Sequence, residues 1–196
     1  MGNSMKPFNS DVHLEEEMKK IIDAFGVEVV IETGTYKGAS TNWFAKNVDK
    51  VCTCELNAKY FNEALSYLTA EGHDNFSIFK GNSPEGLEMF LEENIGKNIL
   101  VFLDAHWYNY CPLMDELEVI ENSDQKPILV IHDFKVEGDN ELPEKHYDSY
   151  NGQDYEWSWI KDAVEDIYGE DGYEKYYNSK ATGSQRGCLF VIPKNK

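Results

Sequence analysis

The sequence predicts an α/β protein built on a doubly wound, mostly parallel β-sheet, and three observations support this class. Short runs rich in Val, Ile, Leu and Phe alternate with longer stretches whose apolar residues recur every three or four positions. The runs 99–103 and 128–131 are apolar at every position, which is typical of strands buried on both faces of a parallel sheet. Glycine and small polar residues mark the junctions between these segments.

The alternation continues through the first two thirds of the chain. An amphipathic helix is expected at 14–25, and Gly26 is placed to end it. Strands and further helices then follow one another, which predicts parallel pairing with helical crossovers. The strands are expected at 27–32, 51–55, 76–79, 99–103 and 128–131, and the later helices at 40–47, 58–68, 84–93 and 112–122.

The last third of the chain has a different pattern. Residues 135–156 are polar, acidic and rich in tyrosine, and we expect them to form a lid-like insertion. A helix is expected at 157–168, and the runs 173–179 and 188–192 are expected to pair as an antiparallel hairpin. No repeat or second domain is apparent, so residues 1–196 are expected to form a single domain.

Composition restricts the partners of the protein. The formal net charge is −18, and such a field repels nucleic-acid phosphates and anionic lipids, so neither nucleic acid nor a membrane is an expected partner. No apolar run approaches the roughly 18 residues of a membrane helix, and no apolar signal segment stands at the N-terminus. The four cysteines resemble buried reduced thiols more than a disulfide framework, which predicts a cytoplasmic protein. Whether it forms a homo-oligomer stays open.

A glycine turn follows the first expected strand. Gly34 permits a sharp turn and lets a ligand approach the backbone, and a helix N-terminus attracts a carboxylate or phosphate. Ser40 and Thr41 are placed to cap the helix and present hydroxyl groups. The alternative is an ordinary strand-to-helix turn. If a cofactor binds here, its candidate contacts are Glu32, Thr33, Gly34, Thr35, Tyr36, Gly38, Ser40 and Thr41.

Polar residues also follow the second and third strands. Glu55 ends the second strand, where an acidic residue can accept hydrogen bonds from both hydroxyls of a ribose; the alternative is a surface carboxylate. Asn82 and Ser83 follow the third strand and are small polar groups suited to an adenine edge. Ser83 is equally suited to cap the next helix.

Asp and His residues follow the fourth and fifth strands. Asp104 and His106 come after the fourth strand, and His132 and Asp133 close the fifth. Ligands of such sheets bind beyond the carboxyl ends of the strands, so these side chains are expected to converge there. They suit a general-base site, or a site where Asp104 and Asp133 hold a hard cation such as magnesium. The alternative is a hydrogen-bond network that only orients loops.

Taken in order, these segments resemble class I S-adenosylmethionine (SAM)-dependent methyltransferases, most of all the small-molecule O-methyltransferases related to macrocin O-methyltransferase. The resemblance implies a Rossmann-like methyltransferase fold with a seven-stranded sheet and an antiparallel C-terminal strand. It also implies methionine contacts at 32–38, ribose at Glu55, adenine near Asn82 and Ser83, and Asp104 beside the methyl donor. Some relatives hold magnesium with carboxylates at the ends of the fourth and fifth strands. The matching segments, within residues 31–193, are IETGTYKGAST, CTCELN, FKGNSPEGL, VFLDAHWYNYCPLMDEL, ILVIHDF and RGCLFVIP.

Two departures from the family pattern concern the site. The first turn has fewer glycines than is common, and Asp104-Ala105-His106 replaces a longer Asp-Gly-x-His motif. The second departure leaves the role of His106 open.

The expected activity is SAM-dependent methyl transfer to a hydroxyl of a small polar molecule such as a sugar. His106 or His132 would take the acceptor proton, Asp104 or Asp133 would orient it or hold magnesium, and residues 135–156 would cover the acceptor. One alternative is an NAD-dependent oxidoreductase, whose ribose Glu55 would also suit but whose Gly-x-Gly-x-x-Gly pattern is missing. Another is a non-catalytic binding protein on the same fold.

Overall fold

The computed structural model describes residues 5–106 and 110–194. Its main strands are β1 (Val29–Thr33), β2 (Lys50–Glu55), β3 (Phe76–Lys80), β4 (Ile99–Leu103), β5 (Ile128–His132), β8 (Tyr173–Tyr177) and β9 (Cys188–Pro193). Its helices are α1 (Val12–Phe25), α2 (Ala39–Ala45), α3 (Ala58–Ala70), α4 (Ser83–Glu93), α5 (Leu113–Asn122) and α6 (Trp157–Tyr168). A 3₁₀ turn, η1 (Phe8–Ser10), precedes α1, and the short strands β6 (Ser149–Tyr150) and β7 (Gln153–Asp154) pair with each other.

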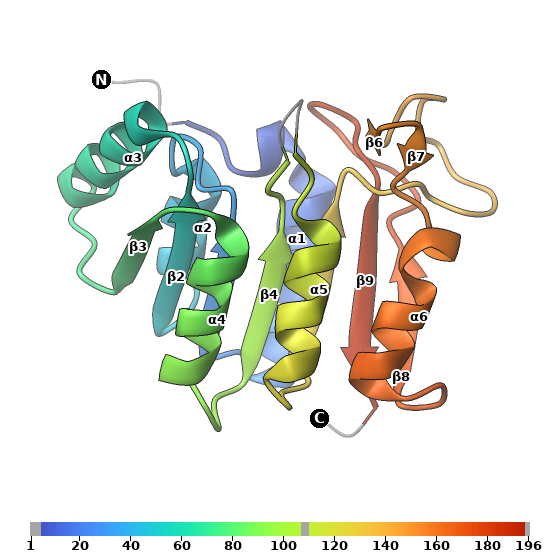
Figure 1. The fold of residues 1–196 in the computed structure, drawn as a ribbon. Helices are drawn as coiled ribbons and strands as arrows, with labels where there is room; N and C mark the ends of the chain where they lie inside the picture. Colours follow the sequence, from blue (N-terminus) through green and yellow to red (C-terminus); the bar gives the residue numbers. More distant parts are fainter. Residues whose placement is uncertain (1–4, 107–109, 195–196) are drawn as a thin grey trace.

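The seven main strands form one sheet in the order β3-β2-β1-β4-β5-β9-β8 (Figure 1). Strands β1 to β5 pair in parallel, whereas β9 is antiparallel to both of its neighbours, β5 and β8. The expected seven-stranded sheet with an antiparallel C-terminal strand is therefore confirmed. Strand order reverses between β1 and β4, and in such sheets this is where ligands bind beyond the carboxyl ends of the strands.

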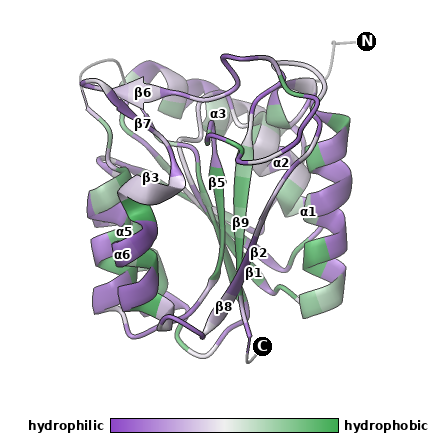
Figure 2. Cartoon of the chain, turned by 90° about the vertical axis from the view of Figure 1, so that its right-hand side faces the viewer, coloured by the Kyte–Doolittle hydropathy of each residue, from purple (hydrophilic) through white to green (hydrophobic). Residues whose placement is uncertain are grey.

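Helices cover both faces of the sheet, with apolar strands between them (Figure 2). Helices α4, α5 and α6 pack on one face, and α1 and α2 pack on the other, with α3 beside α2. Alternate residues of β1 serve the two layers: Val29 and Ile31 face the first, and Val30 faces the second. Both faces are thus buried, which explains the uninterrupted apolar runs in the sequence.

Helix α1 begins two residues earlier than its apolar pattern predicts. The side chain of Asp11 accepts hydrogen bonds from the backbone amides of His13 and Leu14 and so caps the helix. The same carboxylate oxygen accepts a bond of 3.0 Å from the amide of Thr182, far away in the sequence. At its other end, α1 stops at Gly26 in the left-handed conformation, as predicted.

The segment 135–156 folds back over the carboxyl end of β5 and the amino end of β9. Its backbone is pinned to these strand ends and to itself: the Asp148 amide donates to the Asp133 carbonyl at 2.9 Å, and the Gly187 amide donates to the His146 carbonyl at 2.7 Å. The Lys135 amide also bonds to the Tyr155 carbonyl, which closes the segment at its base. The segment therefore lies at the edge of the sheet where ligands are expected. No helix within the described ranges is both long and apolar enough to span a bilayer.

Replacing Met18 with alanine tests the packing of α1. Its side chain is fully buried in the core between α1 and the sheet. Removing it should leave a cavity and lower the free energy of unfolding by about 2–5 kcal/mol, as measured by urea denaturation. The matched control is Val12→Ala on the same helix, where the residue is 49% exposed and a change of about 0.5 kcal/mol or less is expected. Equal losses for the two variants would contradict the described packing.

Candidate functional site

The turn after β1 approaches the loop after β4 closely. Gly34 has φ +85°, and a Cβ on it would lie 2.7 Å from the backbone carbonyl oxygen of Asp104. Only glycine fits this position, for reasons of both conformation and space. The amides of Gly34 and Thr35 donate to the Cys54 carbonyl, and Tyr36, itself at φ +49°, donates its amide to Glu55 Oε2 at 2.7 Å. The turn is thus hydrogen-bonded to β2 and packed against the loop after β4.

Beneath the turn lies the fully buried carboxylate of Glu32. Its Oε2 accepts hydrogen bonds from the hydroxyls of Thr41 and Thr53, whereas Oε1 has no partner within the described residues. Burial raises the pKa of Glu32 to about 7, although these hydrogen bonds lower it. The expected capping of α2 by Ser40 or Thr41 is wrong: Gly38 is the N-cap, no side chain caps the helix, and the Thr41 hydroxyl is directed to Glu32.

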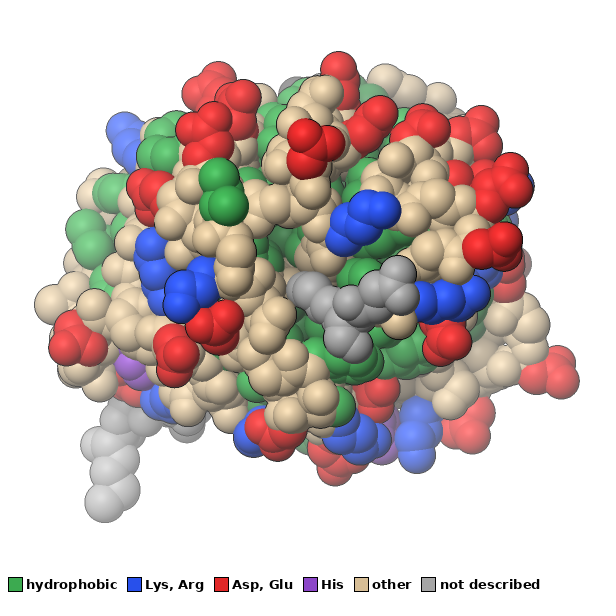
Figure 3. Space-filling view, turned by 90° about the horizontal axis from the view of Figure 1, so that it is seen from below, with side chains coloured by type: hydrophobic (Ala, Val, Ile, Leu, Met, Phe, Trp, Pro, Cys, Tyr) green, Lys and Arg blue, Asp and Glu red, His purple; other side chains and the backbone are tan. Residues whose placement is uncertain are grey.

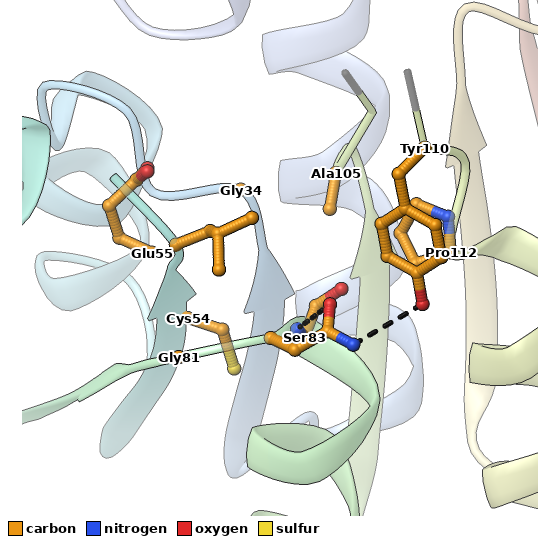
Figure 4. A pocket seen from close by; sticks show the side chains of 10 residues that line it. Gly34, Cys54, Glu55, Gly81, Ser83, Ala105, Tyr110 and Pro112 are labelled. Carbon is orange, nitrogen blue, oxygen red and sulfur yellow. Dashed lines mark hydrogen bonds between the residues drawn. The ribbon is translucent and has the colours of Figure 1, made fainter. Parts of the chain in front are cut away.

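A pocket opens beside the turn at the carboxyl ends of β1, β2 and β3. In Figure 4, Glu55 and Cys54 stand on one side, Tyr110 and Pro112 on the other, and Ser83 lies near the base. Asn82 Nδ2 donates to the Tyr110 hydroxyl at 3.3 Å, which joins the two sides. Four of the candidates from the sequence, Gly34, Glu55, Asn82 and Ser83, line this pocket together, whereas Tyr110 and Pro112, just before α5, were not predicted. The lining consists of Gly34, Cys54, Glu55, Leu56, Gly81, Asn82, Ser83, Ala105, Tyr110 and Pro112.

The remaining cofactor candidates do not line this pocket. The side chains of Glu32, Thr33, Thr35 and Thr41 are buried under the turn and support it from below. Tyr36 is 52% exposed and lies against the ring of Tyr60, with 4.5 Å between the ring centroids. A ligand in the pocket would therefore meet the backbone of the turn more than its side chains.

Glu55 is oriented before any ligand arrives. Its Oε1 accepts a bond of 2.7 Å from the amide of Asn57, and its Oε2 accepts the bond from Tyr36. Burial raises the pKa of Glu55, while the two amide bonds lower it. A carboxylate has about four acceptor positions, so Glu55 retains capacity for hydroxyl donors at the pocket.

The predicted convergence of Asp and His residues is present beside the pocket. His132 Nδ1 lies 2.9 Å from Asp104 Oδ1 and 3.5 Å from Asp133 Oδ2, and the latter lies 3.4 Å from His106 Nε2. The His132 side chain is 3% exposed, whereas that of His106 is 34% exposed. Asp133 has a left-handed backbone with φ +56°, an uncommon conformation that often marks functional sites. Trp107 and Tyr108, which belong to the same motif as Asp104, lie outside the described residues.

Two further members of this group were not predicted. Asp148, from the segment 135–156, places Oδ2 at 3.1 Å from His106 Nε2. Arg186, just before β9, directs Nε to Asp133 and Nη2 to Asp148. Arg186 is the only arginine in the sequence. In so acidic a chain, a single arginine was the one feature of the sequence that could have marked this residue as a site candidate. We call the group the Asp–His–Arg cluster; it comprises Asp104, His106, His132, Asp133, Asp148 and Arg186.

The charges of the cluster support one another. Burial opposes a positive charge on His132, but Asp104 and Asp133 outweigh this and raise its pKa well above the ordinary value. Burial likewise opposes a negative charge on Asp133, but His132, His106 and Arg186 outweigh it and lower its pKa. The cluster therefore holds ionised groups of both signs in close contact.

The cluster does not fit the magnesium site expected at Asp104 and Asp133. Ligand atoms of Asp104, His106 and Asp133 lie within 4.8 Å of one another, which is close enough to surround an ion. However, Arg186 is bonded to Asp133 Oδ1, and His132 is bonded to Asp104 Oδ1. Magnesium demands a near-octahedral set of oxygen ligands, and here Asp104 Oδ1 and both oxygens of Asp133 already face nitrogen atoms.

The acidity of the chain is not confined to the site. Figure 3 shows the molecule from the end opposite to the pocket, where acidic side chains surround the rim with a few lysines between them. A single-signed charge spread over a surface keeps a protein soluble. This distribution favours solubility as the role of the net charge.

Comparisons with known proteins show which solved structures share this fold. No protein-family model matches the sequence, and no curated protein matches it. Among solved structures, an O-methyltransferase from Bacillus cereus in complex with SAH is similar, with a TM-score of 0.66 and 18% identity over 93% of this chain and 81% of that one. The O-methyltransferase TomG from Streptomyces achromogenes, in complex with SAM, gives a TM-score of 0.65 and 16% identity over 92% and 79%. The chain thus has the Rossmann-like fold of SAM-dependent O-methyltransferases.

A second buried carboxylate lies next to the pocket. Glu116, on α5, is 1% exposed, and neither of its oxygens makes a hydrogen bond of good geometry within the described residues. Burial raises its pKa to about 7, although the hydroxyls of Ser83 and Thr33 lower it. Because this folded-state pKa exceeds that of an unfolded glutamate, the folded protein binds the extra proton between about pH 4.5 and 7.

Glu116→Gln should make the protein less sensitive to pH. Stability from this group is present below about pH 4.5 and is lost as the pH rises towards 7, by up to about 3 kcal/mol. The glutamine variant removes that loss, so its free energy of unfolding should fall less between pH 5 and 7 than that of the wild type, as measured by urea denaturation. The control is Glu118→Gln, an exposed position on the same helix. An unchanged pH dependence in Glu116→Gln would show that Glu116 is ionised without cost.

Proposed function

We propose that the protein binds SAM in the pocket and transfers its methyl group to a hydroxyl of a small polar acceptor, with a sugar as the first candidate. One observation carries the proposal: at the switch point of the sheet, Gly34, Glu55 and Asn82 line one pocket, and Ala105 of its lining adjoins Asp104 of the Asp–His–Arg cluster. A pocket lined by a carboxylate, an amide side chain and the glycine turn thus borders a site for proton transfer. The shared fold with SAM-dependent O-methyltransferases supports this function, and the oxidoreductase alternative is not favoured.

The pocket residues suit the parts of SAM. Glu55, fixed by two backbone amides, would accept hydrogen bonds from the ribose hydroxyls. Gly34 is partly exposed and lines the pocket, so its backbone would be within reach of the methionine moiety. Asn82, Ser83 and Tyr110 offer polar groups around the place of the adenine ring. The residues present therefore fit this cofactor, which when bound supplies an electrophilic methyl group.

Proton removal from the acceptor is assigned to His106. His132 is almost fully enclosed and bonded to Asp104, so it serves to orient Asp104. His106 is the more accessible imidazole, and Asp133 and Asp148 hold its Nε2. Burial opposes a charge on His106, but the surrounding carboxylates outweigh it and raise its pKa, which makes the imidazole a stronger base. Much of the rate comes from holding the acceptor hydroxyl in line with the methyl donor.

The segment 135–156 would cover the acceptor. It carries Asp148 into the Asp–His–Arg cluster and brings the ring of Tyr155 edge-on to His106, with 6.4 Å between the centroids. Carboxylates and an aromatic ring next to the proposed base suit a neutral polyhydroxylated molecule. No role for nucleic acid or a membrane is proposed. The cysteines are free thiols, which supports a cytoplasmic location.

Isothermal titration calorimetry with SAM and with S-adenosylhomocysteine tests the cofactor. Binding of both is expected, and Glu55→Ala should weaken it roughly 10- to 100-fold because a charged acceptor for the ribose hydroxyls is lost. The control is Glu63→Ala, an exposed glutamate on α3. If neither SAM nor S-adenosylhomocysteine gave a heat of binding, or if NAD bound in their place, the proposal would be overturned.

Replacing His106 with alanine tests the base. Release of S-adenosylhomocysteine is followed while hydroxylated sugars are screened as acceptors. With an acceptor so found, His106→Ala should lower kcat about 10²- to 10⁴-fold and leave the affinity for SAM unchanged. The control is His73→Ala, where the imidazole bonds to Asn42 away from the pocket. If His106→Ala kept full activity, the base would have to be another group.

A further inference from the structure

Arg186 joins two carboxylates of the Asp–His–Arg cluster. Its Nε is bonded to Asp133 Oδ1, its Nη2 to Asp148 Oδ1, and its Nη1 lies 3.3 Å from the carbonyl oxygen of Lys145. All three guanidinium nitrogens are thus engaged by oxygen atoms. The guanidinium is thus surrounded by carboxylate and carbonyl oxygens, which are also the ligands of hard metal ions.

The guanidinium and a metal ion would compete for the same carboxylate. Asp133 supplies one of the three atoms that could surround an ion, and it is 6% exposed. Its second oxygen, Oδ2, lies near both His106 and His132. A divalent cation bound to Asp133 would therefore lie close to the guanidinium that is bonded to the same carboxylate. The repulsion between the two positive charges is large in a partly buried site.

Arg186 is held firmly in this position. Its side chain is 20% exposed, and its own carbonyl accepts a bond of 3.0 Å from Asn178 Nδ2. The next residue, Gly187, is bonded to the carbonyl of His146 and accepts from the amide of Phe134. The backbone around Arg186 is thus bonded to the residues that follow β5 and β8 and to the segment 135–156, which fixes where the side chain begins.

We infer that Arg186 is the resident cation of this site: its guanidinium takes the place that a divalent ion takes between strand-end carboxylates, and the Asp–His–Arg cluster takes up no magnesium while Arg186 is present. Arg186 is a positioning residue in this account. It holds Asp133 and Asp148 so that both face the Nε2 atom of His106. The inference concerns the same site as the proposed methyl transfer but does not depend on it, because metal binding is measured without a cofactor.

Metal affinity of the full chain tests the inference. Binding of Mg²⁺ is measured by calorimetry, and binding of Mn²⁺, which accepts the same oxygen ligands, by electron paramagnetic resonance. Wild type is expected to bind either ion only weakly, in the millimolar range. Arg186→Met, which removes the charge but keeps a long side chain, should bind Mn²⁺ roughly tenfold tighter or more, because Asp133 and Asp148 lose their cation. Adding Asp133→Asn to this variant should abolish the gain.

Matched variants separate this role from simple stabilisation of the segment. Lys135→Met removes a lysine held by Asp154 and Glu156 in the same segment, and it should leave metal binding unchanged. Arg186→Lys keeps the positive charge and should also resemble the wild type. Circular dichroism checks the folding of each variant. Micromolar binding of Mn²⁺ by the wild type overturns the inference whatever the variants do, and so does a folded Arg186→Met variant with no gain in affinity.

Discussion

The buried carboxylate of Glu32 joins the elements on which the site depends. It stands at the end of the central strand β1 and accepts hydroxyl bonds from Thr53 on β2 and Thr41 on α2. Thr53 is bonded in turn to Thr35 in the turn itself, at 2.6 Å. An ionised carboxylate with an unpartnered oxygen is costly at this depth, and its pKa of about 7 reflects that cost. These bonds fix the shape of the turn. In that shape Gly34 packs against the Asp104 carbonyl, and the Tyr36 amide donates a hydrogen bond to Glu55.

Much of the fold could be predicted because the strands are buried on both faces. Every position of β4 is apolar, and so is every position of β5 before His132, which is the pattern of strands covered on both faces. The start of α1 was predicted two residues late because the apolar pattern begins at Leu14, and the cap, Asp11, gains a third partner, Thr182, only after folding. The capping role expected for Thr41 failed for a related reason, since its hydroxyl serves the buried Glu32 instead of the helix end. Local patterns do not report such long-range partners.

The same distinction applies to the site. Asp104, His106, His132 and Asp133 could be predicted together because parallel strands end at one edge of the sheet. Asp148 and Arg186 could not, since their approach requires the segment 135–156 to fold back and β9 to run antiparallel beside β5. The left-handed backbone of Asp133 is part of that arrangement: its carbonyl accepts the Asp148 amide while its side chain meets Arg186. The unusual conformation is held by bonds on both sides.

Two consecutive residues of the loop after β4 belong to the two different parts of the site. Asp104 turns to His132 and joins the charged cluster, whereas Ala105 lines the pocket and offers only a methyl group. Gly34, which follows β1, packs against the backbone of the same loop. The position of Asp104 therefore depends on the turn that Glu32 stabilises. A ligand that bound against the turn would therefore rest on the backbone that also fixes Asp104 and, through it, His132. The contact between Gly34 and Asp104 thus links the pocket to the cluster, and the relative position of the two sites follows from this contact more than from any single polar side chain.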